Sequence, residues 1–237
     1  MKSGAIQLGV TTFLCACLSG CLGGGGDKGD NSSPPIISTL EFDVQSAYKS
    51  LVAYGSNGNF TISGSCNGTG SKSDAPAATA EAFEGMAGLS AVGILVLSFS
   101  NCTPAMSART YTNFYDFNFT PLGYSSEGVG YGVFLAPPSM PVAARVGNAG
   151  MIGTITMYTD SSKTVGSGRQ DISYAVEADT ADSALVILIT QIFDPAGVLT
   201  STVQDRYRIA RTGPIVPVST DILTPNATAS HLVLTYN

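Results

Sequence analysis

The chain has 237 residues, of which 44% are apolar and only 12% are charged, and its formal net charge is −6 at pH 7. The charged share is about half the usual one, and Gly, Ser, Thr and Asn supply much of the polarity, as is typical of an extracytoplasmic β protein. The acidic balance argues against nucleic-acid binding, which needs a basic surface. We therefore expect no nucleic-acid partner.

Residues 1–20 have the anatomy of a secretory signal peptide. A single positive charge at Lys2 precedes a core of apolar and small residues, Ala5–Leu18, and a small residue stands directly before Cys21. The core is too short and too rich in Gly, Thr and Ser to span a bilayer, which takes about 20 apolar residues. The motif Leu18-Ser19-Gly20-Cys21 resembles the signal of bacterial lipoproteins.

This resemblance implies that the peptide is cut before Cys21 and that the cysteine carries acyl chains. Several chains on one residue make a firm anchor, because each buried CH₂ contributes about 0.8 kcal/mol. The residue after the cysteine is Leu22 rather than Asp, which by the same resemblance implies the outer membrane. The periplasmic and cell-surface faces both stay open. The membrane, reached through the lipid anchor, is thus the first expected partner.

The sequence divides into three parts. Residues 1–20 form the signal peptide, and 21–38 form the lipidated N-terminus with a flexible tether rich in Gly, Ser and Pro. Residues 39–237 are predicted to form a single β-rich globular domain.

Three cysteines remain after cleavage, at positions 21, 66 and 102. With Cys21 committed to lipid, Cys66 and Cys102 form a pair in an oxidising compartment, which predicts a disulfide between them. Such a bond would stabilise the fold by about 3 to 4 kcal/mol in the chain-entropy model. The alternative is a pair of buried thiols.

A short helix is predicted over 43–54, where apolar residues recur at helical spacing between Asp43 as N-cap and Gly55 as C-cap. Residues 67–80, rich in Gly, Ser, Thr and Ala, predict a long loop. The aromatic run 111–119 predicts a strand with one aromatic face from Tyr115 onward. Strands are expected at 60–66, 92–102, 111–119, 130–135, 150–159, 170–177, 184–193, 198–210, 215–222 and 231–236.

Short turns between successive strands, such as 194–197, indicate antiparallel pairing in chain order. The predicted fold is mainly β: an antiparallel meander forming a large curved sheet, with one or two short helices. A sandwich and a closed barrel are the alternatives.

Catalytic chemistry finds little support in the sequence. His231 is the one histidine and lies in a strand pattern, and no Gly-x-Ser-x-Gly stretch accompanies it. Ser46 and Lys49 match Ser-x-x-Lys without the partner motifs of penicillin-recognising enzymes. Asp171 and Glu177 are an acidic pair of a common kind. We expect no catalytic residue, no metal site and no cofactor.

Arg206 and Arg208 belong to the one basic cluster and share a strand face opposite Tyr207. They are candidates for binding a carboxylate or phosphate. The interpretation we favour is that they pair with acids on neighbouring strands, such as Asp171 or Glu177.

The predicted function is therefore that of a lipid-anchored envelope lipoprotein with a non-enzymatic binding or structural role, whose partner is a protein, a glycan or a lipid. The alternative is a carrier that holds a lipid or other apolar ligand in the cavity of a curved sheet, and an envelope hydrolase ranks last. The body is similar to β-rich envelope lipoproteins of proteobacteria, a resemblance that implies no particular activity. A pocket enclosed by the sheet would favour the carrier.

Overall fold

One antiparallel sheet carries the fold. The computed structural model describes residues 38–127, 130–211, 215–225 and 230–237, and Pro35–Asn237 forms one unit. The elements of this unit in chain order are α1 (Val44–Tyr54), β1 (Ser56–Gly64), β2 (Gly68–Asp74), β3 (Thr79–Phe83), β4 (Met86–Phe99), β5 (Met106–Tyr115), β6 (Pro121–Ser126), β7 (Gly130–Phe134), β8 (Ala149–Tyr158), β9 (Gly166–Ala178), β10 (Ser183–Phe193), β11 (Leu199–Ala210), β12 (Val216–Thr224) and β13 (Ser230–Tyr236).

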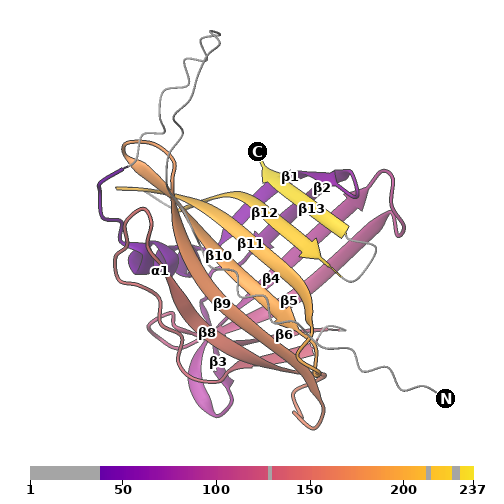
Figure 1. Ribbon diagram of the computed structural model, residues 1–237. Helices are drawn as coiled ribbons and strands as arrows, with labels where there is room; N and C mark the ends of the chain where they lie inside the picture. Colours follow the sequence, from indigo (N-terminus) through magenta and orange to yellow (C-terminus); the bar gives the residue numbers. More distant parts are fainter. Residues whose placement is uncertain (1–37, 128–129, 212–214, 226–229) are drawn as a thin grey trace, which may run out of the picture. The chain divides into compact units, whose positions relative to one another are not determined.

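The sheet closes on itself as a barrel (Figure 1). From β4 to β13 each strand pairs with the next, β13 then pairs with β1, and β1 pairs with β2. The closing contact is made by β2, which pairs with the second half of β4, while β3 pairs with its first half. The ring therefore has 12 strands, with β3 as an extension beside β2. Of the arrangements that the sequence left open, the closed barrel is the one observed.

Helix α1 begins and ends where the sequence predicts. The Asp43 carboxylate accepts a hydrogen bond from the backbone N–H of Ser46 at 2.9 Å, which satisfies one of the free donors of the first turn. Gly55 follows the helix with a φ of 73°, and a Cβ there would lie 2.4 Å from the Asp74 carbonyl oxygen. Only glycine fits this turn from α1 into β1.

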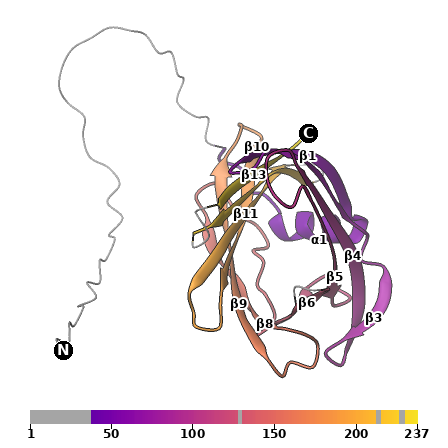
Figure 2. The ribbon, with the colours of Figure 1, turned by 90° about the vertical axis from the view of Figure 1, so that its right-hand side faces the viewer.

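Helix α1 lies inside the ring of strands (Figure 2). Val44 packs against Val176 and Val186 of the β9–β10 wall, and Val52 packs against Ala91 and Tyr115 of the β4–β5 wall. A barrel of about eight strands is just filled by its own side chains, so a wider ring needs further filling. The helix supplies it at one end.

A second apolar cluster fills the interior on the other side. Its buried members are Phe60, Ile62 and Leu234. Next to it, a disulfide joins Cys66 and Cys102, with 5.7 Å between the Cα atoms. The predicted disulfide is thus present, and it ties the β1–β2 turn to the β4–β5 turn.

The predicted loop over 67–80 is wrong, because this stretch contains β2 and the first two residues of β3. Strand β2 has no large apolar residue, which hid it from the sequence pattern. Its inward residues include Lys72 and Asp74, which are polar, and Gly70, which lies against Phe60. A Cβ on Gly70 would lie 2.3 Å from Phe60 Cε2. The strand is held by backbone pairing along both edges.

The predicted aromatic strand face beyond Tyr115 is also wrong. The Asp116 carboxylate accepts backbone hydrogen bonds from Asn118 at 2.8 Å and Thr120 at 2.7 Å, which closes a turn and ends β5. Phe117 is 63% exposed in this turn. Strand β6 follows, and it was not predicted either.

Candidate functional site

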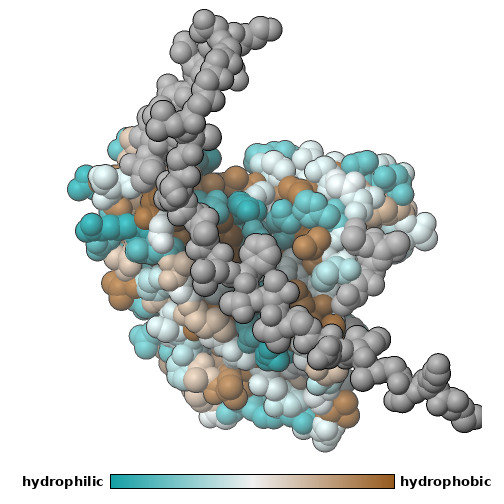
Figure 3. All heavy atoms as spheres, viewed as in Figure 1, coloured by the Kyte–Doolittle hydropathy of each residue, from teal (hydrophilic) through white to brown (hydrophobic). Residues whose placement is uncertain are grey.

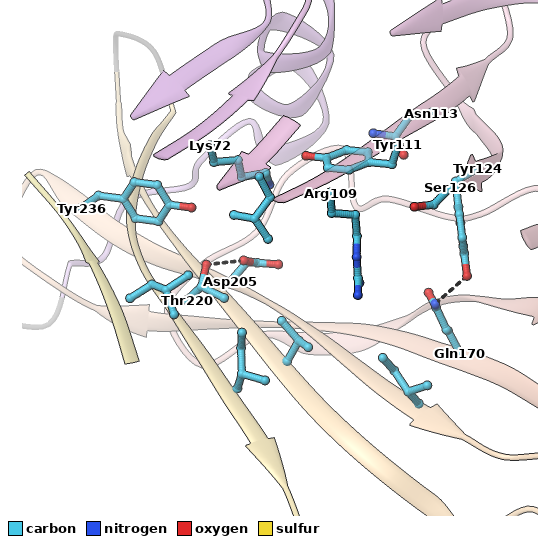
Figure 4. Close-up of a pocket in the computed structure, with 15 residues that line it drawn as sticks. Lys72, Arg109, Tyr111, Asn113, Tyr124, Ser126, Gln170, Asp205, Thr220 and Tyr236 are labelled. Carbon is cyan, nitrogen blue, oxygen red and sulfur yellow. Dashed lines mark hydrogen bonds between the residues drawn. The ribbon is translucent and has the colours of Figure 1, made fainter. Parts of the chain in front are cut away.

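A cavity of about 350 Å³ lies inside the barrel, within the range of small-molecule sites. Inward-facing side chains from both walls line it (Figure 4). They are Lys72, Leu95, Arg109, Tyr111, Asn113, Tyr124, Ser126, Gln170, Ile192, Val203, Asp205, Thr220, Ile222, Leu234 and Tyr236.

The wall of the cavity has two chemical characters. Aliphatic side chains from β4 and from β10 to β13 make an apolar area, which consists of Leu95, Ile192, Val203, Ile222 and Leu234. The remaining lining residues carry hydroxyl, amide or charged groups. An amphipathic lining of this kind suits a molecule with an apolar body and a polar group that fixes its orientation.

A charged and hydrogen-bonded layer crosses the interior near α1. Lys72 Nζ lies 3.6 Å from Asp74 Oδ2, and the Tyr111 hydroxyl donates to Asp74 Oδ1 at 2.6 Å. On the facing strands, Thr220 Oγ1 donates to Asp205 Oδ1 at 2.6 Å. Lys72 keeps 30% of its side-chain surface accessible because it lines the cavity. We call Lys72, Asp74, Tyr111, Asp205 and Thr220 the polar layer.

The protonation states of the polar layer follow from its surroundings. Desolvation acts to lower the pKa of Lys72, but the attraction of Tyr207, Asp74 and other neighbours outweighs it and holds that pKa well above its ordinary value. Burial raises the pKa of Tyr111, so its hydroxyl keeps the proton that it donates to Asp74. The layer therefore keeps its ammonium and its phenol at neutral pH.

A second space of about 280 Å³ lies between the polar layer and α1. Lys72, Tyr111 and Asn113 line both spaces, and Leu51 and Val52 of the helix close the second one from the other side. The polar layer thus forms the floor of the main cavity, with the helix behind it.

Aromatic rings lie against glycines of the neighbouring strand and so leave the interior open. A Cβ on Gly93 would lie 2.2 Å from the Tyr111 ring, and one on Gly132 would lie 2.3 Å from the Tyr124 ring. In both pairs the glycine is the direct cross-strand partner of the tyrosine. The absent Cβ lets each ring lie flat on the wall.

The part of the cavity farthest from α1 holds Arg109, Tyr124 and Gln170. Gln170 Nε2 donates to the Tyr124 hydroxyl oxygen at 3.0 Å and lies 3.2 Å from Met157 Sδ. Burial raises the pKa of Tyr124, against the opposing effects of the Gln170 hydrogen bond and the Arg109 charge. Sequence reasoning missed Arg109, although residues 109, 111, 113 and 115 alternate onto one strand face.

Arg206 and Arg208 lie on the outer face of β11, away from the cavity. Arg208 binds Asp179 with two nitrogens, at 2.7 and 3.1 Å, and Arg206 Nη2 donates to Gln204 Oε1 at 2.9 Å. Arg208 therefore pairs with an acid, as the favoured interpretation expected, but this acid is Asp179 of the β9–β10 turn. Asp171, which was named as a possible partner, binds Arg169 instead.

The other candidates from the sequence do not come together. His231 Nε2 lies 2.9 Å from Asp221 Oδ1, and half of its side-chain surface is exposed, at 50%. Ser46 lies in the first turn of α1, where its backbone N–H donates to the N-cap residue Asp43. Across residues 38–127, 130–211, 215–225 and 230–237, His, Cys, Asp and Glu nowhere gather in threes that could hold a metal ion.

The acylation candidate Cys21 lies outside the described residues. In the described part of the chain, no helix combines the length and the apolar character needed to cross a membrane.

No family model, no curated protein and no solved structure matches this chain. A closed barrel with an internal cavity is compatible with a binding or carrier role for an apolar ligand. The chemistry of the cavity itself therefore has to indicate the function.

Proposed function

We propose that this protein is a lipid-anchored envelope protein that binds and carries a small amphipathic molecule inside its barrel. The observation that carries the proposal is the cavity of about 350 Å³, whose lining combines aliphatic side chains with hydroxyl, amide and charged groups. The aliphatic side chains favour a ligand's apolar body by about 25 cal/mol per Å² removed from water, and the polar groups set its orientation. The proposal develops the carrier alternative of the sequence analysis.

The side of the barrel shown in Figure 3 offers an apolar ligand less than the interior does. On the face shown in Figure 3, hydrophobic and hydrophilic residues are interspersed. A binding patch on the outside would be a contiguous apolar area of several hundred Å². The interior cavity is therefore a better candidate for ligand binding than this face.

The anchor part of the proposal rests on Leu18-Ser19-Gly20-Cys21 and on the tether behind it. The composition of this segment is the one expected of a tether, and about 14 residues of Gly- and Ser-rich chain would average roughly 20 Å end to end. A tether of that length would keep the barrel close to the membrane that supplies its ligand. Cys21→Ser should move the protein from the membrane fraction to the soluble fraction. Membrane fractionation of this variant that matches the wild type contradicts the anchor.

The carrier role is tested on the full chain carrying Cys21→Ser and purified without detergent. Native mass spectrometry and organic extraction should find a small molecule at one per chain, and octanol should bind in calorimetric titration. Val203→Trp, which fills the cavity, should abolish both. Val92→Trp is the matched control because Val92 is 46% exposed and lies outside the cavity lining. An empty extract together with no octanol binding contradicts the carrier role.

A further inference from the structure

The cavity contains two cations with different surroundings. Lys72 belongs to the polar layer, with Asp74 at 3.6 Å. Arg109 is exposed within the cavity lining, and its side chain has no hydrogen bond or ion pair with any residue that the structure describes. By contrast, Arg145, Arg169 and Arg208 each hold a carboxylate within 3.1 Å.

From this difference we infer that the molecule in the cavity carries an anionic head, a carboxylate or a phosphate, that binds Arg109. The inference rests on the proposed carrier role and names the chemical class of its ligand. A guanidinium offers a planar fork of N–H donors that matches both heads with paired hydrogen bonds. The chain has 17 acidic and 11 basic residues, and Asp205 lines the same cavity as Arg109. No ion pair joins Arg109 to this or any other described carboxylate, so the guanidinium is available to an anion from outside.

The position of Arg109 on β5 places its side chain where a ligand in the cavity can contact it. It stands opposite Leu95 in the pairing of β4 with β5 and shares its strand face with Tyr111 and Asn113. Figure 4 shows its side chain reaching into the cavity between Tyr111 and Tyr124. Because Arg109 is exposed, a ligand can reach it from solvent.

Two neighbours add donors for the same head. The Tyr124 hydroxyl accepts a hydrogen bond from Gln170, so its own proton is free to donate to an anionic oxygen. The Asn113 side-chain amide makes no hydrogen bond to another described residue and offers two further N–H groups. Arg109, Asn113 and Tyr124 can thus all donate hydrogen bonds to an incoming anion, and the positive charge of Arg109 disfavours a cationic head beside it.

The apolar body of the ligand has its own place. Leu95 is the direct cross-strand partner of Arg109, and Ile192 and Val203 line the same cavity from β10 and β11. A ligand whose anionic head binds Arg109 therefore has its apolar tail against these aliphatic side chains. A medium-length chain matches a cavity of about 350 Å³, which is at the small end of ligand sites.

The test is a calorimetric titration of the full chain carrying Cys21→Ser with octanoate, octyl phosphate, octanol and octylammonium at neutral pH. Octanoate or octyl phosphate should bind about tenfold or more tightly than octanol, since hydrogen bonds to charged groups are the strong ones. The comparison of the first two probes tells which head is preferred. Arg109→Gln should remove the preference for the anionic probes over octanol, whereas Arg109→Lys should retain part of it.

Arg206→Gln is the matched control, because Arg206 lies on the outer face of β11, where it donates a hydrogen bond to Gln204. It should keep the preference for the anionic probes. If octanol binds and the anionic probes bind no tighter, or if octylammonium binds tightest, the inference is overturned while the carrier role stands. If none of the four probes binds, the carrier role itself is wrong.

Discussion

Replacing Gly93 by Ala tests how the aromatic lining keeps the cavity open. A Cβ at this position would lie 2.2 Å from Cε2 and Cζ of Tyr111 and 2.6 Å from its hydroxyl oxygen. Carbon atoms in favourable contact are about 3.5 to 4 Å apart, so the ring has to move by more than about 1 Å. Because the ring is rigid, this movement also breaks the 2.6 Å hydrogen bond from Tyr111 to Asp74.

The expected loss of stability has two sources. Forcing an extra methyl group into a packed site costs about 1 to 3 kcal/mol. Losing a hydrogen bond to a charged group costs about 1.5 to 3 kcal/mol. Both arise from one displacement of Tyr111, so we expect Gly93→Ala to lower the free energy of unfolding by about 2 to 5 kcal/mol.

Guanidinium unfolding of the full chain carrying Cys21→Ser measures this loss. Gly166→Ala is the control, because no atom lies within 4 Å of the added Cβ, and it should change stability by less than about 0.5 kcal/mol. With Tyr111→Ala already present, Gly93→Ala should become neutral or stabilising by up to about 1 kcal/mol, since Ala loses less backbone entropy than Gly. An equal loss in both backgrounds would refute the clash as its cause.

Two further predictions concern the disulfide and an outer ion pair. Replacing Cys66 and Cys102 by Ser should lower the free energy of unfolding by about 4 kcal/mol, given their separation of 36 residues; a denaturant midpoint equal to that of the unreduced wild type would contradict this. The hydrogen bonds from Arg208, and then from Ser183, lower the pKa of Asp179. The resulting stability is present above the ordinary pKa of the carboxyl and is lost as pH falls through its lowered value. Arg208→Gln should therefore raise that pKa in an NMR titration and move acid unfolding to higher pH; an unmoved carboxyl resonance would show that Arg208 is not the cause.

The sequence predicted a helix or strand correctly where a local pattern of residues determines that element. Helix α1 was predicted within a residue because Asp43, Gly55 and the helical spacing of apolar residues agree. Strands β8 to β13 were predicted because each combines alternation or a buried apolar run with a turn at its end. These signals are local, so one sequence suffices to find them.

Barrel closure depends on partners that are distant in sequence, and the sequence pattern did not reveal it. Strand β2 has polar residues on its inner face, where Lys72 and Asp74 point into the cavity, so the usual rule of apolar residues inside misassigns it. Arg109 was missed for a related reason. The strand was expected to begin at Tyr111, and only a start at Met106 places the arginine on the face that lines the cavity.

The polar layer is compatible with the proposed binding role of the interior. A charged pair inside a protein contributes less to stability than well-packed apolar residues of the same volume, because both ions lose hydration. Helix α1 and the cluster around Phe60 already fill the barrel on two sides, and aliphatic side chains at 72, 74 and 205 would extend that filling. Instead, Lys72, Asp74 and Asp205 hold their charges beside open space. Folding alone does not call for such a lining, whereas a ligand with a polar group does.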